Sequence, residues 1–263
     1  MTAAVLPVWW DAAADGPTNM AADELLAEEA ARHGGLVIRI YSWATPAVSL
    51  GAFQSLAEAA GCPAIAGLPL VRRPSGGGAI VHGTDLTYAA AVPKAHPWGR
   101  TPQTLYDAMH NAMAAVLADF GIPARLHAAA VTDPPADAFL CFARRSAGDL
   151  VAPHAGRAAT TGDPKIMGSA QRRLGTTVLQ HGSLLLAANH AVGAEARLPG
   201  LAELADRDHP WESAQIAEPW LQAVAAEAGA VLDHRTGASW SGRESTIQTR
   251  AERFLDRQWT ARR

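Results

Sequence analysis

Three consecutive glycines, Gly76–Gly78, predict a loop that the rest of the chain is arranged around. Glycine has no Cβ, so the backbone there can take positive φ angles and approach a ligand closely. Arg72 and Arg73 precede the loop, and exposed N–H groups beside arginines suit an anionic or carbonyl-bearing group. The apolar residues up to Tyr88 indicate that the loop joins strands of a sheet. A tight hairpin with two surface arginines would have the same sequence, and glycines alone do not choose between the two interpretations.

The composition describes a globular protein and excludes several classes of partner. The chain has 263 residues, 49% hydrophobic and 18% charged, enough for one large domain or two small ones. A net charge of −3 gives no reason to expect nucleic acid, and no apolar run approaches the roughly 20 residues that span a membrane. Cys62 and Cys141 form no CxxC motif, and the N-terminus shows no secretory signal. We therefore expect a cytoplasmic protein with free thiols.

Helix and strand signals alternate along the chain. A helix is expected from Thr18 or Asn19, as its cap, to about His33, and another from Thr101 to Gly121, with proline at its first position. Strands are expected at 36–43, 47–54, 68–71, 86–92, 122–131 and from 149, with a loop at 133–135 and paired strands at 165–171 and 178–186. Residues 152–164 look like an insertion rich in Gly, Pro and Thr. After Asn189 we expect helices near 195–206, 213–228 (restarted by Pro219) and 243–258.

Cys141 and Lys165 are the two candidates for chemistry. A free cysteine is most often a small buried hydrophobe, and becomes a nucleophile only where a cation or backbone N–H groups stabilise the thiolate. Lys165, His82 or the two arginines could supply that charge. Lys165 itself stands in a strand-like segment, where a lysine normally faces solvent, but Gly168 and Ala170 would let a ligand lie against the strand. We treat Cys62 as structural.

The remaining motifs narrow the reaction class. His82 and His181 each follow an apolar residue and could be acid–base groups or structural imidazoles. No HExxH or CxxC spacing is present, so no metal site is expected. A GxSxG elbow and a P-loop lysine are also missing, which argues against a serine hydrolase or a P-loop nucleotide site.

Taken together, the segments resemble the lipoate–protein ligase A / octanoyltransferase family, within the biotin/lipoate A/B ligase superfamily. The resemblance rests on motifs in the family's order over roughly residues 9 to 187: 19–23, 41–43, 48–54, 72–82, 85–88, 141–142, 165–173 and 179–183. It implies an α/β fold like that of class II aminoacyl-tRNA synthetases and biotin ligases, with a mainly antiparallel mixed sheet flanked by helices. We expect one catalytic domain over 1–263, with a core at 1–190 and a helical C-terminal extension at 191–263 packed on it.

The resemblance also implies roles for particular residues. Cys141 and Lys165 would be catalytic, with Lys165 contacting the acyl carbonyl. The substrate would be bound by residues of the glycine loop and of the lysine strand: Arg73, Ser75, Gly76, Gly77, Gly78, His82, Gly168, Ser169 and Ala170. The family often has an acidic residue after the histidine; here it is Gly83, so no role for that carboxylate carries over.

The Cys-Phe element at Cys141 is similar to that of ligase-like octanoyltransferases, and implies transfer of octanoyl from acyl carrier protein, through a cysteine thioester, to a lysine of a lipoyl domain or of the glycine cleavage H protein. No cofactor and no metal would be needed. An ATP- and Mg²⁺-dependent lipoate–protein ligase, an amidotransferase between lipoyl domains, and a non-catalytic acyl-binding subunit remain as alternatives. ATP dependence, a donor swap, and loss of activity without Cys141 would separate them.

Overall fold

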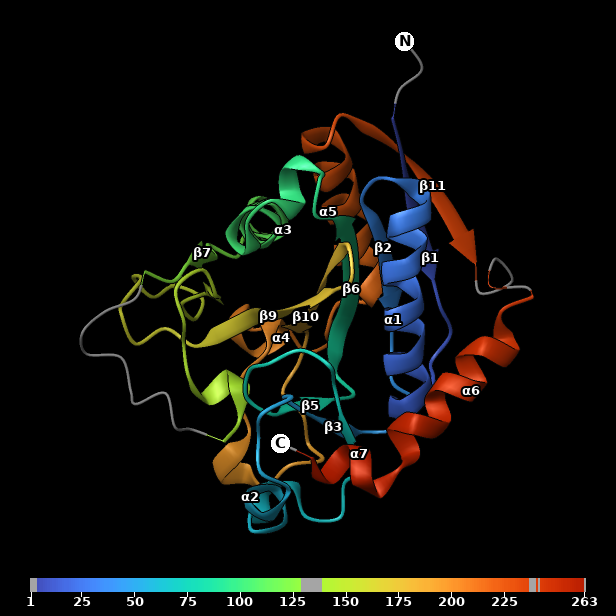
Figure 1. The fold of residues 1–263 in the computed structure, drawn as a ribbon. Coiled ribbons are helices and arrows are strands. Elements are labelled where there is room, and N and C mark those ends of the chain that lie inside the picture. Colours follow the sequence, from blue (N-terminus) through green and yellow to red (C-terminus); the bar gives the residue numbers. More distant parts are fainter. Residues whose placement is uncertain (1–3, 129–138, 237–239, 241, 263) are drawn as a thin grey trace.

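A computed structural model describes residues 4–128, 139–236, 240 and 242–262. One large sheet runs through the molecule, in the order β11-β1-β2-β6-β10-β9-β8-β7, and most of its neighbouring strands are antiparallel (Figure 1). Only the pairs β11–β1 and β1–β2 are parallel among these strands. The expected mixed, mainly antiparallel sheet flanked by helices is therefore confirmed.

The strands of the large sheet are β1 (Ala4–Trp10), β2 (Val37–Tyr41), β6 (Asp85–Pro93), β7 (Arg125–Leu126), β8 (Leu150–Val151), β9 (Lys165–Leu174), β10 (Thr177–Leu185) and β11 (Ala230–Thr236). A second sheet, in the order β4-β3-β5, consists of β3 (Ala47–Leu50), β4 (Leu70–Arg72) and β5 (Ile80–His82). It lies below the end of β6 in Figure 1 and carries the glycine loop between β4 and β5.

The helices are α1 (Gly16–His33), α2 (Leu56–Ala60), α3 (Pro102–Asp119), α4 (Leu201–Leu204), α5 (Ser213–Glu227), α6 (Glu244–Leu255) and α7 (Arg257–Ala261), and the short 3-10 turns are η1 (Pro63–Ile65), η2 (Pro97–Gly99), η3 (Cys141–Ala143) and η4 (Ala194–Ala196). The helix from Thr101 starts as predicted, because the Thr101 side chain accepts from the Thr104 N–H and Pro102 follows. The predicted cap of α1 was wrong: Asp15 accepts from the Thr18 N–H, so the helix begins at Gly16. The Asn19 side chain instead donates to the carbonyls of Ala14 and Ser42.

Two hydrophobic cores lie on opposite faces of the large sheet, because neighbouring residues of a strand point to opposite faces. In β2, Ile38 and Ile40 pack in the core that α3 and α5 cover. Val37 and Tyr41 pack in the other core, under α1 and α6. Figure 1 shows α1 and α6 side by side on that face.

The sequence prediction differed from the structure mainly at the sheet edge. β1 and β11 were not predicted, and β11 makes the segment after residue 191 more than a set of helices. The strand expected at 122–131 is reduced to β7; its end and the loop at 133–135 lie outside the described residues. Pro219 does not restart a helix but lies inside the continuous α5. Residues 152–164 form turns without a helix or strand, and no helix in the described ranges is long and apolar enough to cross a membrane.

Candidate active site

Cys141 is attached to the glycine loop by its main chain. It opens η3, and its N–H donates to the Ala79 carbonyl at 2.7 Å, while the Ala79 N–H donates to the Phe139 carbonyl at 2.9 Å. The sequence separation between the two segments is large, yet they pair as a short bridge of parallel backbone. The position of the cysteine relative to the loop is therefore fixed by backbone hydrogen bonds.

Two glycines of the loop are required by this arrangement. Gly78 faces the cysteine so closely that a Cβ there would lie 2.9 Å from both the backbone N and the Cα of Cys141. Gly77 has a φ of +90°, which side chains rarely allow, and a Cβ on it would stand 3.7 Å from the Cβ of Ala170 on β9. The glycine loop therefore lies between Cys141 and β9.

Arg73 braces the loop from inside. Its Nη1 donates to the Ser49 carbonyl, and its Nη2 donates to the carbonyls of Gly76 and Gly78, each at 2.7 Å. Burial lowers the pKa of Arg73 to about 10, partly offset by the negative charge of a Cys141 thiolate and reinforced by the Arg144 cation. The guanidinium remains charged at neutral pH and keeps the loop carbonyls turned toward itself.

Lys165 meets the cysteine. Its Nζ lies 3.5 Å from the Cys141 Sγ and 2.9 Å from an Asp149 carboxylate oxygen, and its side chain is only 4% exposed. Burial acts to lower the pKa of Lys165, but the thiolate of Cys141 and the carboxylate of Asp149 together raise it above its ordinary value. Gly168 makes room for this side chain, since a Cβ there would be 2.4 Å from the lysine Cε. The ammonium is therefore charged, buried and directed at sulfur.

His82 is held in a closed hydrogen-bond network. Its Nε2 is 2.8 Å from the Ser49 Oγ, its Nδ1 is 2.8 Å from Asp85, and its ring stacks on Trp43 with centroids 4.0 Å apart. Burial would raise the pKa of Asp85, but His82 and hydrogen bonds from Ser183 and Gly83 lower it to about 2. Because both ring nitrogens have partners, the structural interpretation of His82 fits better than an acid–base role.

Some buried polar groups near the loop keep free hydrogen-bonding capacity, among them Ser75 of the loop and His181, which pairs with Ala170 opposite Gly77. The Ser75 Oγ and the His181 Nε2 have no partner among the described residues. The other ring nitrogen of His181 lies 3.1 Å from Asp23, whose pKa is lowered by His181 and Arg39 although burial acts to raise it. These two groups are available to a polar part of a ligand.

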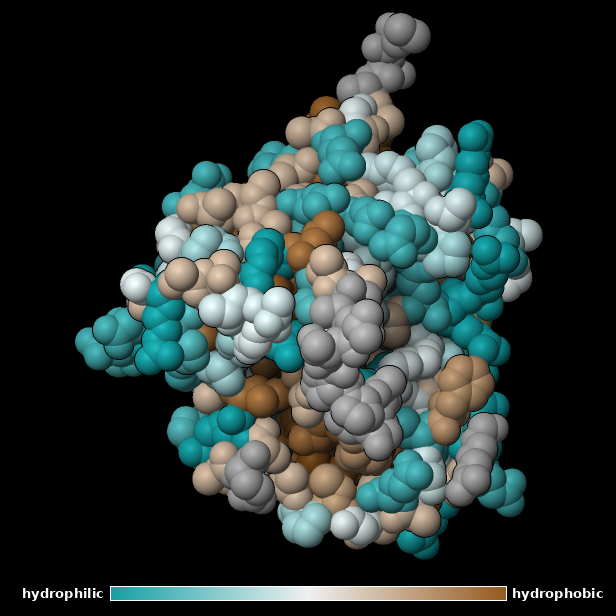
Figure 2. Space-filling model, turned by 90° about the vertical axis from the view of Figure 1, so that its left-hand side faces the viewer, coloured by the Kyte–Doolittle hydropathy of each residue, from teal (hydrophilic) through white to brown (hydrophobic). Residues whose placement is uncertain are grey.

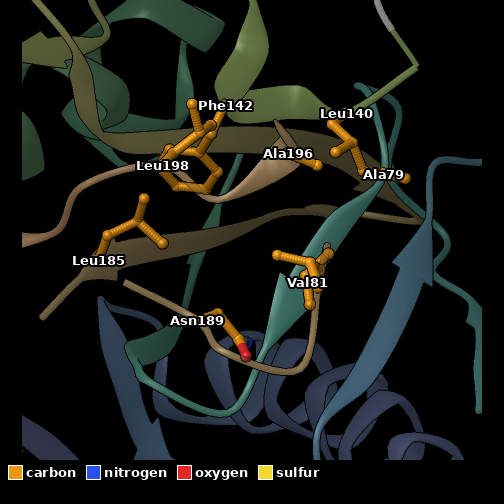
Figure 3. A pocket seen from close by; sticks show the side chains of 9 residues that line it. Ala79, Val81, Leu140, Phe142, Leu185, Asn189, Ala196 and Leu198 are labelled. Carbon is orange, nitrogen blue, oxygen red and sulfur yellow. The ribbon is translucent and has the colours of Figure 1, made fainter. Parts of the chain in front are cut away.

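An apolar pocket adjoins the residues on either side of the cysteine. Its lining is Ala79, Val81, Leu140, Phe142, Leu185, Asn189, Val192, Ala196 and Leu198. Figure 3 shows Phe142, Leu198, Leu185 and Val81 pointing into one space, with Asn189 as the polar side chain at its edge. On the face of the molecule that carries β7, Figure 2 shows a hollow with apolar walls. Cys141 packs against a small apolar cluster of Ile80, Phe142 and Leu185, and the last two of these residues also line the pocket.

Residues 15–197 match the family model described as the lipoyl protein ligase A/B catalytic domain. The chain belongs to this family. Among curated members of related sequence, octanoyltransferase LipM of Symbiobacterium thermophilum is 36% identical over 180 residues, covering 65% of this chain and 61% of the relative. Octanoyltransferase LipM of Moorella thermoacetica is 34% identical over 191 residues, covering 66% of this chain and 63% of the relative. The chain thus spans less than two thirds of the length of these relatives.

The fold agrees with the lipoyl protein ligase A/B family. The bipartite lipoate protein ligase of Thermoplasma acidophilum, studied with its E2 lipoyl domain, superimposes with a TM-score of 0.65 at 15% identity, covering 98% of this chain and 94% of that one. At such low identity the likeness concerns the fold alone.

The structure brings many of the residues predicted for the family site together. Cys141, Lys165, Arg73, Gly77, Gly78 and Ala170 lie around the glycine loop, and Gly168 borders the lysine. Ser169 points to the opposite face of the sheet, where its hydroxyl contacts Tyr88 and His110. Gly76 faces Phe53 at the outside of the loop. The residues that line the apolar pocket are not among the predicted substrate-binding residues, such as Gly77, Gly168 and Ala170.

Sequence reasoning missed several residues that build the site. Asp149 was seen only as the start of a strand, and Asp85 and Ser49 were not connected with His82. Tyr106, whose hydroxyl donates to Asp149 at 2.8 Å, was not predicted either. Tyr106 and His110 stand four residues apart, on one side of a helix whose apolar stripe runs through Leu105 and Met109. Polar residues at that spacing were the available signal for Tyr106.

Proposed function

We propose that this chain is an octanoyltransferase that moves an octanoyl group from a carrier-protein thioester to a lysine of an acceptor protein, through a thioester on Cys141. The contact that carries the proposal is the 3.5 Å approach of the Lys165 Nζ to the Cys141 Sγ. A buried ammonium beside a thiol favours the thiolate, which is the nucleophilic form of cysteine. Membership of the lipoyl protein ligase A/B family and the LipM relatives supports the same reaction.

In the first step the Cys141 sulfur bonds to the acyl carbon of the donor. The bond from that carbon to the carrier's sulfur breaks, and the carrier leaves as a thiol after taking up a proton. The ammonium of Lys165 has three N–H groups, and the described residues accept from it at two points, Asp149 and Cys141. The remaining N–H can stabilise the oxyanion that forms on the acyl oxygen.

In the second step an acceptor lysine, as the free amine, attacks the acyl carbon held on Cys141. The carbon–nitrogen bond of the amide forms, the bond to the Cys141 sulfur breaks, and the nitrogen loses a proton. Two half-reactions on one cysteine remove the need to bind both proteins at once.

Several contacts support a hydrocarbon substrate at this site. The small residues Gly77 and Ala170 face each other beside the nucleophile, and Leu140 and Phe142 line the apolar pocket next to it. We assign the acyl end to the glycine loop, with Arg73 and Ser75–Gly78 around it. His82 and Gly168 would hold the loop and the lysine in shape, and Ser169 would act only through the strand it belongs to.

The acceptor we propose is a lipoyl domain or the glycine cleavage H protein, and the donor is octanoyl-acyl carrier protein. The Thermoplasma ligase is described together with its E2 lipoyl domain, which supports a lipoyl domain as the acceptor. No cofactor takes part in the steps above. ATP and Mg²⁺ would be needed only if the chain were a ligase.

Intact-mass spectrometry after incubation with octanoyl-acyl carrier protein tests the proposal. We expect one octanoyl adduct on the wild type and on the Cys62→Ser control, and none on Cys141→Ser. The adduct should disappear when a lipoyl domain is added, with the mass appearing on that domain.

Other outcomes point to the alternatives. Acceptor modification only with octanoate or lipoate, ATP and Mg²⁺ would identify a ligase. An adduct formed from octanoylated H protein but not from the carrier protein would identify an amidotransferase. Acyl binding without any covalent adduct or transfer would indicate a non-catalytic acyl-binding subunit.

A further inference from the structure

Asp149 is a buried carboxylate in direct contact with Lys165. Its carboxylate is 3% exposed, and its Oδ2 accepts from the Lys165 ammonium at 2.9 Å. The same oxygen accepts from the Ser146 N–H at 2.7 Å, and the Oδ1 accepts from the Tyr106 hydroxyl at 2.8 Å. The carboxylate is thus held by three donors from three different segments.

Tyr106 ties this carboxylate to helix α3. Its ring lies over Gly148, where a Cβ would come within 2.9 Å of the ring, and Gly148 has a φ of +87°. One turn further along α3, the His110 Nδ1 is 2.8 Å from the Gly148 carbonyl. Burial and the Asp149 charge raise the pKa of Tyr106 well above its ordinary value, so the phenol keeps its proton and donates it to the carboxylate. The turn before β8 is therefore fixed by α3 from two sides.

A lysine side chain has four flexible methylenes, and its ammonium has no fixed direction of its own. Before it loses its proton, the thiol of Cys141 is a weak acceptor and cannot fix the ammonium by itself. A buried carboxylate that two further donors, the Ser146 N–H and the Tyr106 hydroxyl, hold in place is a rigid partner that can. We propose that Asp149 and Tyr106 are positioning residues that hold the Lys165 ammonium against the Cys141 sulfur. Their importance for acyl transfer rests on the proposed function, whereas their effect on the thiol does not.

Positioning and simple charge predict opposite effects when the carboxylate is neutralised. If Asp149 only added a negative charge near the sulfur, its removal would make the thiolate easier to form. If Asp149 holds the ammonium in place, its removal lets Lys165 swing away, and the thiolate becomes harder to form. Among the described residues, the other charged or titratable groups around the pair include Arg73 of the glycine loop, Arg144 after η3, Tyr106 and His110 of α3, and His127, whose backbone N–H donates to the Asp149 carbonyl.

Alkylation of Cys141 by iodoacetamide measures thiolate formation without any acyl donor. Peptide mass spectrometry follows the rate at this cysteine across about two pH units either side of 8.5. For Asp149→Asn we expect the midpoint of this profile to move up by about one unit, a roughly tenfold loss of rate at neutral pH. In the Lys165→Met background the same substitution should no longer move the midpoint up, because only the direct effect of the Asp149 charge remains. A midpoint that moves down, or does not move, would overturn the positioning role.

Tyr106→Phe keeps the ring over Gly148 and removes only the hydroxyl, so it is the gentler test of the same contact. We expect a shift in the same direction, with a loss of rate of about threefold, because Asp149 keeps two of its three donors. Tyr88→Phe is the matched control: its buried hydroxyl bonds to Ser169 and Gln180 rather than to Asp149. Equal shifts in Tyr106→Phe and Tyr88→Phe would mean a general effect of losing a buried hydroxyl, and would contradict the proposal for Tyr106.

Discussion

Two buried cations, Arg39 and Lys165, are paired with carboxylates in different ways. Arg39 donates to Asp11 at 2.5 Å, to Asp23 at 2.7 Å and to the Asn19 side chain at 2.9 Å, and Asp23 also accepts from Tyr41. Lys165 has the Asp149 carboxylate and, as its second partner among the described residues, a thiol. Both cations lie in the interior, but only the arginine is surrounded by strong acceptors.

The difference separates a scaffold from a reactive centre. A buried charge is costly unless partners satisfy it, and a saturated group such as Arg39 with its carboxylates has nothing left to offer a substrate. The lysine is stabilised enough to stay charged but keeps an N–H and a reactive sulfur within reach. The first group holds α1 against β2; the second is where we locate the chemistry.

Arg39→Met removes the cation whose nitrogen atoms all have hydrogen-bond partners, and should have the largest effect on folding. It leaves the buried Asp23 and the partly buried Asp11 without the arginine, so we expect a loss of about 3–5 kcal/mol in the free energy of unfolding. Urea denaturation measures it. The control is Arg250→Met, which removes an ion pair to the half-exposed Glu28 and should cost less than about 1 kcal/mol. A small loss in Arg39→Met would mean that the group is not the scaffold we describe.

Lys165→Met breaks the reactive side. Formation of the octanoyl-enzyme should slow by about 100- to 1,000-fold, because an oxyanion donor and the cation beside the sulfur are both lost. Single-turnover mass spectrometry follows this rate. The free energy of unfolding should fall less than in Arg39→Met, since Asp149 keeps the donors Tyr106 and Ser146. A rate near that of the wild type would remove Lys165 from the mechanism.

Asp85 adds a pH-dependent test of a third buried pair. Its folded pKa of about 2 lies below the unfolded value of 3.8, so the carboxylate stabilises the fold above about pH 4. This contribution, about 2 kcal/mol, should be lost as the pH falls from about 4 to about 2. Urea denaturation of the wild type and of Asp85→Asn between about pH 5 and about pH 2 measures it. We expect a flatter profile in the variant, and identical slopes would contradict the pairing with His82.

Trp259→Phe should have the smallest effect. Trp259 contacts a third buried cation, Arg72, whose partners are backbone carbonyls rather than carboxylates. The indole N–H of Trp259 donates to the Arg72 carbonyl at 3.0 Å, and the Arg72 guanidinium donates to the carbonyls of Thr260 and Gly51. Loss of one hydrogen bond should cost about 1 kcal/mol, read from urea denaturation. Trp10→Phe, which removes the exposed bond to His234, is the control and should cost less. A larger loss in the control would show that burial of the Arg72 contact adds nothing.

The sequence predicted those parts of the fold that local signals specify. The helix that begins after Thr101 and the paired strands 165–171 and 178–186 were predicted because caps and apolar runs are encoded within each segment. β11 was missed because it is an edge strand in which the short apolar start at 230–232 is followed by four polar residues, 233–236. Such a strand lacks the apolar run that marks a buried one.

For the site, residue type and family motifs were enough to select Cys141 and Lys165, and the structure brings them into contact. Asp149 could not be found in this way, because its contact with Lys165 depends on how β8 pairs with β9 around an irregular register. Its contact with Tyr106 depends on how α3 packs on the turn. Both are long-range facts of packing that no short stretch of sequence contains.

The backbone bond from Cys141 to Ala79 has a consequence for competition between proteins. Because backbone hydrogen bonds fix the position of residue 141, we expect a side chain of similar size there to leave the neighbouring surface unchanged. Cys141→Ser should therefore still bind the octanoyl-carrier protein but be unable to remove its octanoyl group. When mixed with the wild type, the inactive variant should compete for the donor protein and slow the wild-type reaction.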